Sequence, residues 1–99
     1  MKLWVDDERH PPDGSWQWAT NSADAVRWLQ DACVAEISLD HDLGGMDTTR
    51  PVVTFMCLEE IWPQVIYVHT ANPVGGEWLM GTCQRYAPET TRVSRRYLW

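Results

Sequence analysis

Three short apolar runs, each ending abruptly at polar or acidic side chains, dominate the sequence. They cover residues 3–5, 37–39 and 65–68, and the last is rich in side chains that favour strands. Each run is too short for a helix and is typical of a buried strand. A weaker run at residues 16–20 alternates polar and apolar side chains, which favours another strand.

Helical patterns lie between these runs, and each has a residue suited to the first position of a helix. The candidate caps are Asn21 or Ser22, Thr48 or Thr49, and Asn72. A last strand is expected somewhere in residues 92–99. Strands that alternate with helices indicate an α/β fold with a mostly parallel sheet. We therefore expect about five strands with helices on both faces.

The length of 99 residues corresponds to a single domain, residues 1–99. No apolar run approaches the roughly 20 residues that span a bilayer, so we expect no membrane contact. The N-terminal segment reaches acidic residues too early for a signal peptide. The three cysteines form no C-x-x-C pair and are expected to be free thiols in a reducing cytoplasm.

The charge is unevenly distributed along the chain. Residues 1–60 hold twelve acidic and four basic side chains, and residues 61–99 hold two acidic and four basic ones. A protein that binds a DNA duplex non-specifically needs a strongly basic surface, which this sequence lacks. The acidic half is expected to attract cations instead.

Unusual side chains follow three of the predicted strands. Asp6 and Asp7 follow the first, residues 40–42 (Asp-His-Asp) follow the next, and residues 69–72 (His-Thr-Ala-Asn) follow the third. Parallel sheets bind ligands at the carboxyl ends of their strands, so these groups are expected to converge at one edge. Gathered carboxylates repel one another unless a proton or a cation neutralises them. Asp6, Asp7 and Asp40 are therefore candidate ligands for Mg²⁺ or Mn²⁺.

The same residues resemble the motifs of response-regulator receiver domains, which have a flavodoxin-like fold. Asp6 and Asp7 resemble the acidic pair that holds Mg²⁺, Asp40 the phosphorylated aspartate, and Thr70 the hydroxyl that contacts the phosphoryl group. Asp42 matches a position whose backbone carbonyl contacts the metal in that family. The chain departs from the pattern because a proline-rich loop at residues 9–15 replaces the first helix and there is no room for the last one. The expected lysine near the fifth strand is also absent.

Further motifs resemble a narrower family, the receiver-like domains proposed to process cyclic phosphates in bacteria and phages. These motifs are residues 6–12 (Asp-Asp-Glu-Arg-His-Pro-Pro), residues 39–44 (Leu-Asp-His-Asp-Leu-Gly) and residues 68–75 (Val-His-Thr-Ala-Asn-Pro-Val-Gly). The resemblance extends from residue 1 to about residue 80. It implies metal-dependent binding and hydrolysis of a cyclic or terminal phosphate on a nucleotide or RNA end.

On this interpretation, two sets of residues carry the chemistry. The candidate catalytic residues are Asp40, His41, His69 and Thr70, and the candidate substrate-binding residues are Arg9, Asp42, Asn72 and Gly75. A histidine can move protons, and a helix N-terminus can bind phosphate through its N–H groups. Each histidine can instead be a hydrogen-bonded structural residue, and alternation along a strand turns His41 away from Asp40 and Asp42. Arg9 can pair with the acidic residues or with a ligand phosphate.

Two other functions remain open from the sequence. The chain can bind a nucleotide signal without turnover, as a phage protein that sequesters a host signal would. It can also be a divergent phosphoacceptor receiver, which Asp40 and Thr70 favour and the missing lysine disfavours. The aromatic C-terminus, residues 95–99, can either stack on a base or close the core.

Overall fold

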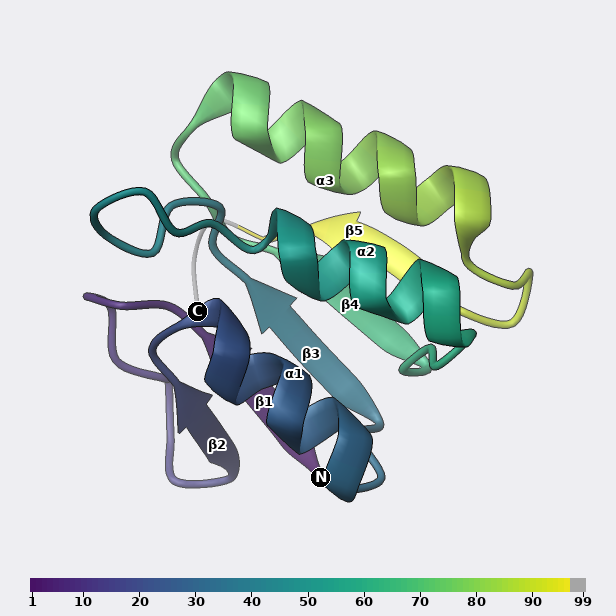
Figure 1. Ribbon diagram of the computed structural model, residues 1–99, viewed down its shortest axis with the longest axis horizontal. Helices are drawn as coiled ribbons and strands as arrows, with labels where there is room; N and C mark the ends of the chain where they lie inside the picture. The colour runs from purple at the N-terminus through teal and green to yellow at the C-terminus, as the bar shows by residue number, and fades with distance from the viewer. Residues whose placement is uncertain (97–99) are drawn as a thin grey trace.

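The computed structural model describes residues 1–96 of the chain, in which strands and helices alternate as expected (Figure 1). The strands are β1 Lys2–Val5, β2 Trp16–Ala19, β3 Glu36–Leu39, β4 Val65–Val68 and β5 Arg92–Arg95. The helices are α1 Ser22–Asp31, α2 Arg50–Glu59 and α3 Pro73–Tyr86. The continuation of the last strand beyond residue 96, and the contacts expected of residues 97–99, lie outside the described residues. No helix within residues 1–96 is long and apolar enough to cross a membrane.

All five strands are parallel, in the order β2-β1-β3-β4-β5. Their carboxyl ends therefore lie at one edge of the sheet, as the sequence predicted. The α/β class and the receiver-like strand order are confirmed. Within residues 1–96 no helix lies between β1 and β2, which confirms that the first helix of a receiver is missing.

The expectation that helices cover both faces of the sheet is wrong. The three helices lie on the same side of the sheet, with α2 between α1 and α3 (Figure 1). Each helix connects one strand to a strand further along in the same direction, from β2 to β3, β4 and then β5. Right-handed crossovers that all step in one direction place their helices on the same face. A helix between β1 and β2, which step in the opposite direction, would by the same rule have covered the other face.

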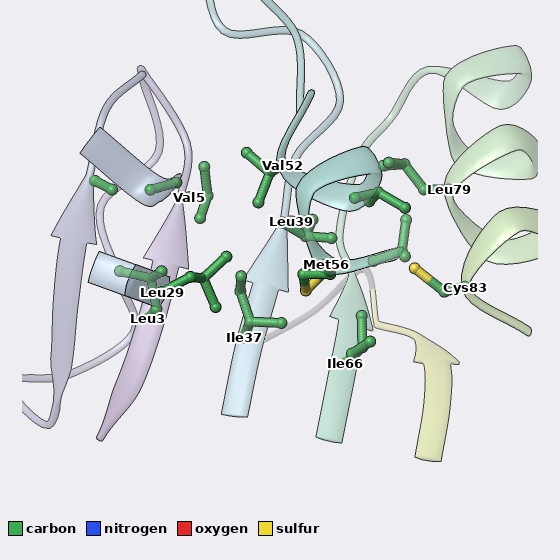
Figure 2. Close-up of a cluster of buried hydrophobic side chains, with 14 of the residues drawn as sticks. Leu3, Val5, Leu29, Ile37, Leu39, Val52, Met56, Ile66, Leu79 and Cys83 are labelled. Atoms are coloured by element: carbon green, nitrogen blue, oxygen red, sulfur yellow. The ribbon is translucent and has the colours of Figure 1, made fainter. Parts of the chain in front are cut away.

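One hydrophobic core fills the space between the sheet and its helices (Figure 2). Alternate residues of each strand point toward it, as the period of two requires. The strands contribute Leu3, Val5, Ile37, Leu39, Ile66 and Val68, and the helices contribute Leu29, Val52, Met56, Leu79 and Cys83. This layer fixes β1, β3 and β4 side by side and so fixes the positions of the residues that follow them.

Tryptophan side chains pack on the face that the helices leave bare. Trp4 is fully buried there and meets Trp16 edge-on at 5.6 Å between ring centroids. The Trp4 Nε1–H donates to the carbonyl of Arg9 at 2.7 Å, and the Trp18 Nε1–H donates to the carbonyl of Asp6 at 2.7 Å. The indole rings therefore anchor the loop that replaces the first helix.

The predicted capping residues are found at two helix starts. Asn21 accepts the N–H of Asp24 at 2.8 Å, and Asn72 accepts the N–H of Gly75 at 3.0 Å. Thr49 occupies the cap of α2 but makes no capping bond, and its hydroxyl donates instead to the carbonyl of Asp40 at 2.6 Å. The start of α2 is thus tied to the end of β3.

Candidate functional site

A pocket of about 310 Å³ opens at the carboxyl ends of β1, β3 and β4. Its lining residues are Asp7, Glu8, Asp40, Asp42, Gly44, Thr70, Ala71 and Asn72. We call this the acidic pocket, because four of the eight lining side chains are carboxylic and none is basic. It lies where a parallel sheet is expected to bind its ligand.

Asp6, Asp7 and Asp40 converge beside this pocket and form what we call the acidic cluster. One carboxylate oxygen from each residue lies within 4.8 Å of the other two. Within residues 1–96 no other group of three acidic, histidine or cysteine side chains is gathered this closely. The three residues predicted from the sequence to hold a metal ion are therefore together in the structure.

Asp6 is the buried member of the cluster, with 2% of the residue exposed. Its Oδ1 accepts the backbone N–H groups of Glu8 at 2.9 Å and Arg9 at 3.0 Å. Its Oδ2 lies 2.8 Å from Nε2 of His69. Burial is the largest influence and raises the pKa of Asp6, but the bonds from His69, Arg9 and Glu8 together lower it below its ordinary value. Asp6 is therefore ionised at neutral pH.

Asp40 has the opposite balance. Burial and the negative charge of Asp6 raise its pKa above the ordinary value. Hydrogen bonds from the Thr70 hydroxyl and from the His41 backbone N–H, the latter at 2.8 Å, oppose this rise only in part. The hydrogen bonds therefore do not fully offset the repulsion between the carboxylates of the cluster, and a bound cation would reduce that repulsion.

The donor set fits the predicted metal. Mg²⁺ and Mn²⁺ favour oxygen ligands, and the three carboxylates of the acidic cluster offer only oxygen. Gly44 leaves room for Asp7 in this arrangement, because a Cβ on Gly44 would lie 3.0 Å from Oδ2 of Asp7. Gly44 also has a φ of +85°, a conformation that glycine adopts readily.

Thr70 and Asn72 form the wall of the pocket next to Asp40. The buried Thr70 hydroxyl bonds to Asp40 and accepts the backbone N–H of Asn72 at 3.2 Å. The Asn72 side chain caps α3 through its oxygen and donates to Oδ2 of Asp42 at 3.0 Å. Both Asp42 and Asn72 line the pocket, as their predicted substrate-binding role requires.

His69 is close to the acidic cluster but does not line the pocket. Its side chain is 1% exposed and stacks on Trp4 at 4.1 Å between ring centroids. One ring nitrogen contacts Asp6, and the other lies 2.7 Å from the hydroxyl of Ser38. The histidine therefore lies behind Asp6 and away from the space that a substrate would occupy.

His41 also lies outside the pocket lining, on the helix side of the sheet. Its Nε2 accepts the Nε–H of Arg50 at 2.9 Å, so its Nδ1 carries the proton and donates to Oδ1 of Asp42 at 3.0 Å. The Arg50 guanidinium lies over the Trp78 ring at 4.8 Å. As alternation predicts, Asp40 and Asp42 reach the pocket and His41 turns away from it.

Two predicted substrate-binding residues also lie outside the pocket lining. Gly75 packs against His41, since a Cβ at this position would lie 2.3 Å from the imidazole. The backbone N–H of Gly75 donates to the side chain of Asn72, the cap of α3. Arg9 supplies its backbone N–H to Asp6, and its exposed guanidinium lies over the Trp4 ring at 6.0 Å.

The structure also includes residues that the sequence interpretation did not select. Glu8 lines the pocket, and its place directly after Asp6 and Asp7 was a signal that could have identified it. Ser38 is a lone polar residue within an apolar run, which was a weaker signal. Arg50 begins a helix ten residues after Asp40, and nothing in the sequence connects it with His41.

Comparison with known proteins agrees with this architecture. The family model for the cyclic-phosphate processing receiver domain matches residues 1–85. A comparison with curated proteins finds no match. Of the elements described in residues 1–96, the matched stretch contains four of the five strands, the acidic cluster and all the described residues that line the acidic pocket. The chain therefore belongs to the family of cyclic-phosphate processing receiver domains.

Proposed function

We propose that this chain binds and hydrolyses a cyclic or terminal phosphate on a nucleotide or RNA end, with Mg²⁺ or Mn²⁺ held by Asp6, Asp7 and Asp40. The observation that carries this proposal is the convergence of these three carboxylates beside a pocket that no basic side chain lines. A phosphate entering a pocket of four carboxylic side chains meets like charge, so a cation is needed to hold it. A bound divalent ion supplies that charge and polarises the phosphoryl oxygens.

The residues around the pocket have separate roles in this proposal. Asp40 and Thr70 border the space for the reacting phosphate, and Asp40 would there help to hold the metal ion that polarises it. Asp42 stays ionised, because bonds from Asn72 and His41 lower its pKa, and it can accept a hydrogen bond from a sugar hydroxyl. His41 acts through Asp42, which it holds at the pocket.

The test is a turnover assay with the purified chain. The substrates are cyclic nucleotides, RNA ends with a 2′,3′-cyclic phosphate and RNA ends with a terminal phosphate, each with Mn²⁺, with Mg²⁺ or with a chelator. Chromatography should show product only with metal, and Asp40→Ala should abolish it. Asp31→Asn, which also removes one acidic side chain but lies exposed at the end of α1, should retain full turnover. Metal-independent cleavage, or cleavage that survives Asp40→Ala, would refute the proposal.

A phosphoacceptor function is the second candidate, and the bond between Thr70 and Asp40 favours it. Treatment with a small phosphodonor should then add the mass of one phosphoryl group, and Asp40→Asn should prevent the addition. If the assay gives neither product nor this mass shift, but labelled cyclic nucleotide stays on the protein, the chain is a binding protein without turnover.

A further inference from the structure

A buried chain of hydrogen bonds extends from the acidic cluster into the sheet, and the proposed chemistry does not use it. Oδ2 of Asp6 lies 2.8 Å from Nε2 of His69, and Nδ1 of His69 lies 2.7 Å from Oγ of Ser38. Ser38 is fully buried, and the side chains of His69 and Asp6 are 1% and 3% exposed. A polar group buried this deeply costs free energy unless its hydrogen bonds are made. Removing Asp6, His69 or Ser38 would therefore leave a buried partner without its bond.

The partners of His69 determine which of its nitrogens carries the proton. A carboxylate oxygen accepts hydrogen bonds, so Nε2 of His69 donates its hydrogen to Oδ2 of Asp6. Within residues 1–96 the Ser38 hydroxyl has no other hydrogen-bond partner, so it donates to Nδ1. The two bonds therefore favour the Nε2–H form of the His69 ring, in which Nε2 donates to Asp6 and Nδ1 accepts from Ser38.

Trp4 restricts the orientation of the imidazole. The two rings are stacked, with an interplanar angle of 9° and 4.1 Å between centroids. Trp4 is fully buried, and its Nε1–H donates to the carbonyl of Arg9. The indole therefore cannot move aside, and the direction in which His69 donates its hydrogen bond is fixed.

The hydrogen bonds to Asp6 limit the number of lone pairs that its carboxylate can offer to a cation. A carboxylate has about four acceptor positions, two on each oxygen. Glu8 and Arg9 occupy both positions on Oδ1, and His69 occupies one on Oδ2. One position on Oδ2 remains, so Asp6 can offer a cation a single lone pair from one oxygen.

We propose that Ser38 and His69 are positioning residues of the metal centre. They act through Asp6, whose one remaining lone pair they hold toward Asp7 and Asp40. This inference rests on the proposed metal-dependent function, because the cluster must bind a cation for the orientation to matter. Replacing a residue that orients a metal ligand commonly lowers metal affinity by about 10- to 100-fold.

The first experiment measures Mn²⁺ affinity by titration calorimetry, without substrate. His69→Leu removes the donor to Asp6 and should weaken binding by about 10- to 100-fold, and Ser38→Ala should weaken it by about 10-fold or less. His69→Gln retains an N–H donor and should recover most of the lost affinity. Ser94→Ala and His10→Leu are matched controls, since both residues are exposed, and they should bind Mn²⁺ as the unmodified chain does.

The second experiment uses ¹⁵N NMR of the metal-free chain, which reports on His69 even if a variant fails to fold. The unmodified chain should show His69 protonated at Nε2, with Nδ1 accepting a hydrogen bond. In Ser38→Ala the Nδ1 resonance should move toward that of a nitrogen without a hydrogen bond, while Nε2 stays protonated. A purely space-filling role for Ser38 would leave this resonance unchanged.

The outcomes separate the inference from the function on which it rests. If the unmodified chain binds Mn²⁺ and His69→Leu and Ser38→Ala bind it equally well, the positioning role is wrong and the proposed function stands. An Nδ1–H imidazole at His69 also overturns the positioning role alone. If the unmodified chain does not bind Mn²⁺, the metal-dependent function and the positioning role fail together.

Discussion

His41 and His69 follow neighbouring strands of the same sheet, yet they have different surroundings. His69 comes directly after β4, whereas one residue separates His41 from β3, and Leu39 pairs with Val68 where the two strands end. An offset of one residue turns a side chain to the opposite face of a sheet. His41 therefore lies on the helix side beside Gly75, and His69 lies on the other side against Trp4.

The difference shows that position in the register, more than residue type, decides what each histidine does. Both imidazoles use both nitrogens, and each contacts an aspartate. The aspartate bound by His69 is buried, whereas the Asp42 side chain bound by His41 is 60% exposed. His69 packs against the buried indole of Trp4, whereas His41 contacts the partly exposed Arg50. Substitutions around His69 should therefore lower the free energy of unfolding more than substitutions around His41.

Trp4→Ala should have the largest effect, because it removes the ring beneath His69. Loss of a buried tryptophan typically lowers the free energy of unfolding by about 3–5 kcal/mol. Trp78→Ala removes the half-buried ring beneath Arg50 and should cost less. Urea unfolding of both variants measures the difference. Equal losses would mean that the two sides are equally important for stability.

Gly75→Ala should be next, because it disturbs the His41 side sterically. The added Cβ would lie 2.3 Å from the imidazole, and overpacking of this kind costs about 1–3 kcal/mol. Gly81→Ala in the same helix has no atom within 4 Å of its new Cβ and should stabilise the chain by about 0.5–1 kcal/mol. Thermal unfolding of both variants provides the check, and a gain in stability for Gly75→Ala would contradict the close packing.

Arg50→Gln should have a smaller effect, near 1 kcal/mol, because it removes one hydrogen bond and one partly exposed ring contact. Combining it with His41→Ala measures the coupling. If the two residues act together, the double variant should lose less stability than the sum of the single losses. Additive losses in urea unfolding would show that the arginine does not act through His41.

Asp40→Asn should have the smallest effect, and it should raise the free energy of unfolding, which most of the variants above lower. Both His41 and His69 contribute to the pKa of Asp40. The pKa of Asp40 is raised in the folded chain, so its contribution to stability falls as the pH rises from the ordinary value of 3.8 through the raised one. The variant should therefore be more stable than the unmodified metal-free chain at neutral pH, by less than about 1 kcal/mol because the pocket is open to water. Thermal unfolding at several pH values should show that the gain disappears in acid, and a gain independent of pH would contradict this assignment.

The sequence predicted the elements of the fold because each depends on local features. Apolar runs indicated the strands, and Asn21 and Asn72 marked two helix starts. Convergence of the acidic cluster was also predictable, since it depends only on parallel strands having their ends together. The side of the sheet that the helices cover was predicted wrongly, because it depends on the direction in which successive crossovers step.

The surroundings of the histidines could not be predicted for a related reason. They depend on register to within one residue and on contacts between distant segments. Ser38 meets His69 across 31 residues of sequence, and Arg50, at the start of α2, meets His41 across the loop between β3 and α2. No local pattern records such a pairing. The assignment of catalytic roles to His41 and His69 stays a prediction, and their geometry supports action through Asp42 and Asp6.

The strand order has a consequence for how the chain forms during synthesis. β1 pairs with β2 and β3, and β4 and β5 then add in turn to the free edge of the sheet. A ribosome therefore releases the strands in an order that lets the sheet grow outward without rearrangement. All three members of the acidic cluster emerge within the first 40 residues, whereas His69 emerges about 30 residues later. The three carboxylates are thus synthesised before His69, the residue that we propose orients Asp6.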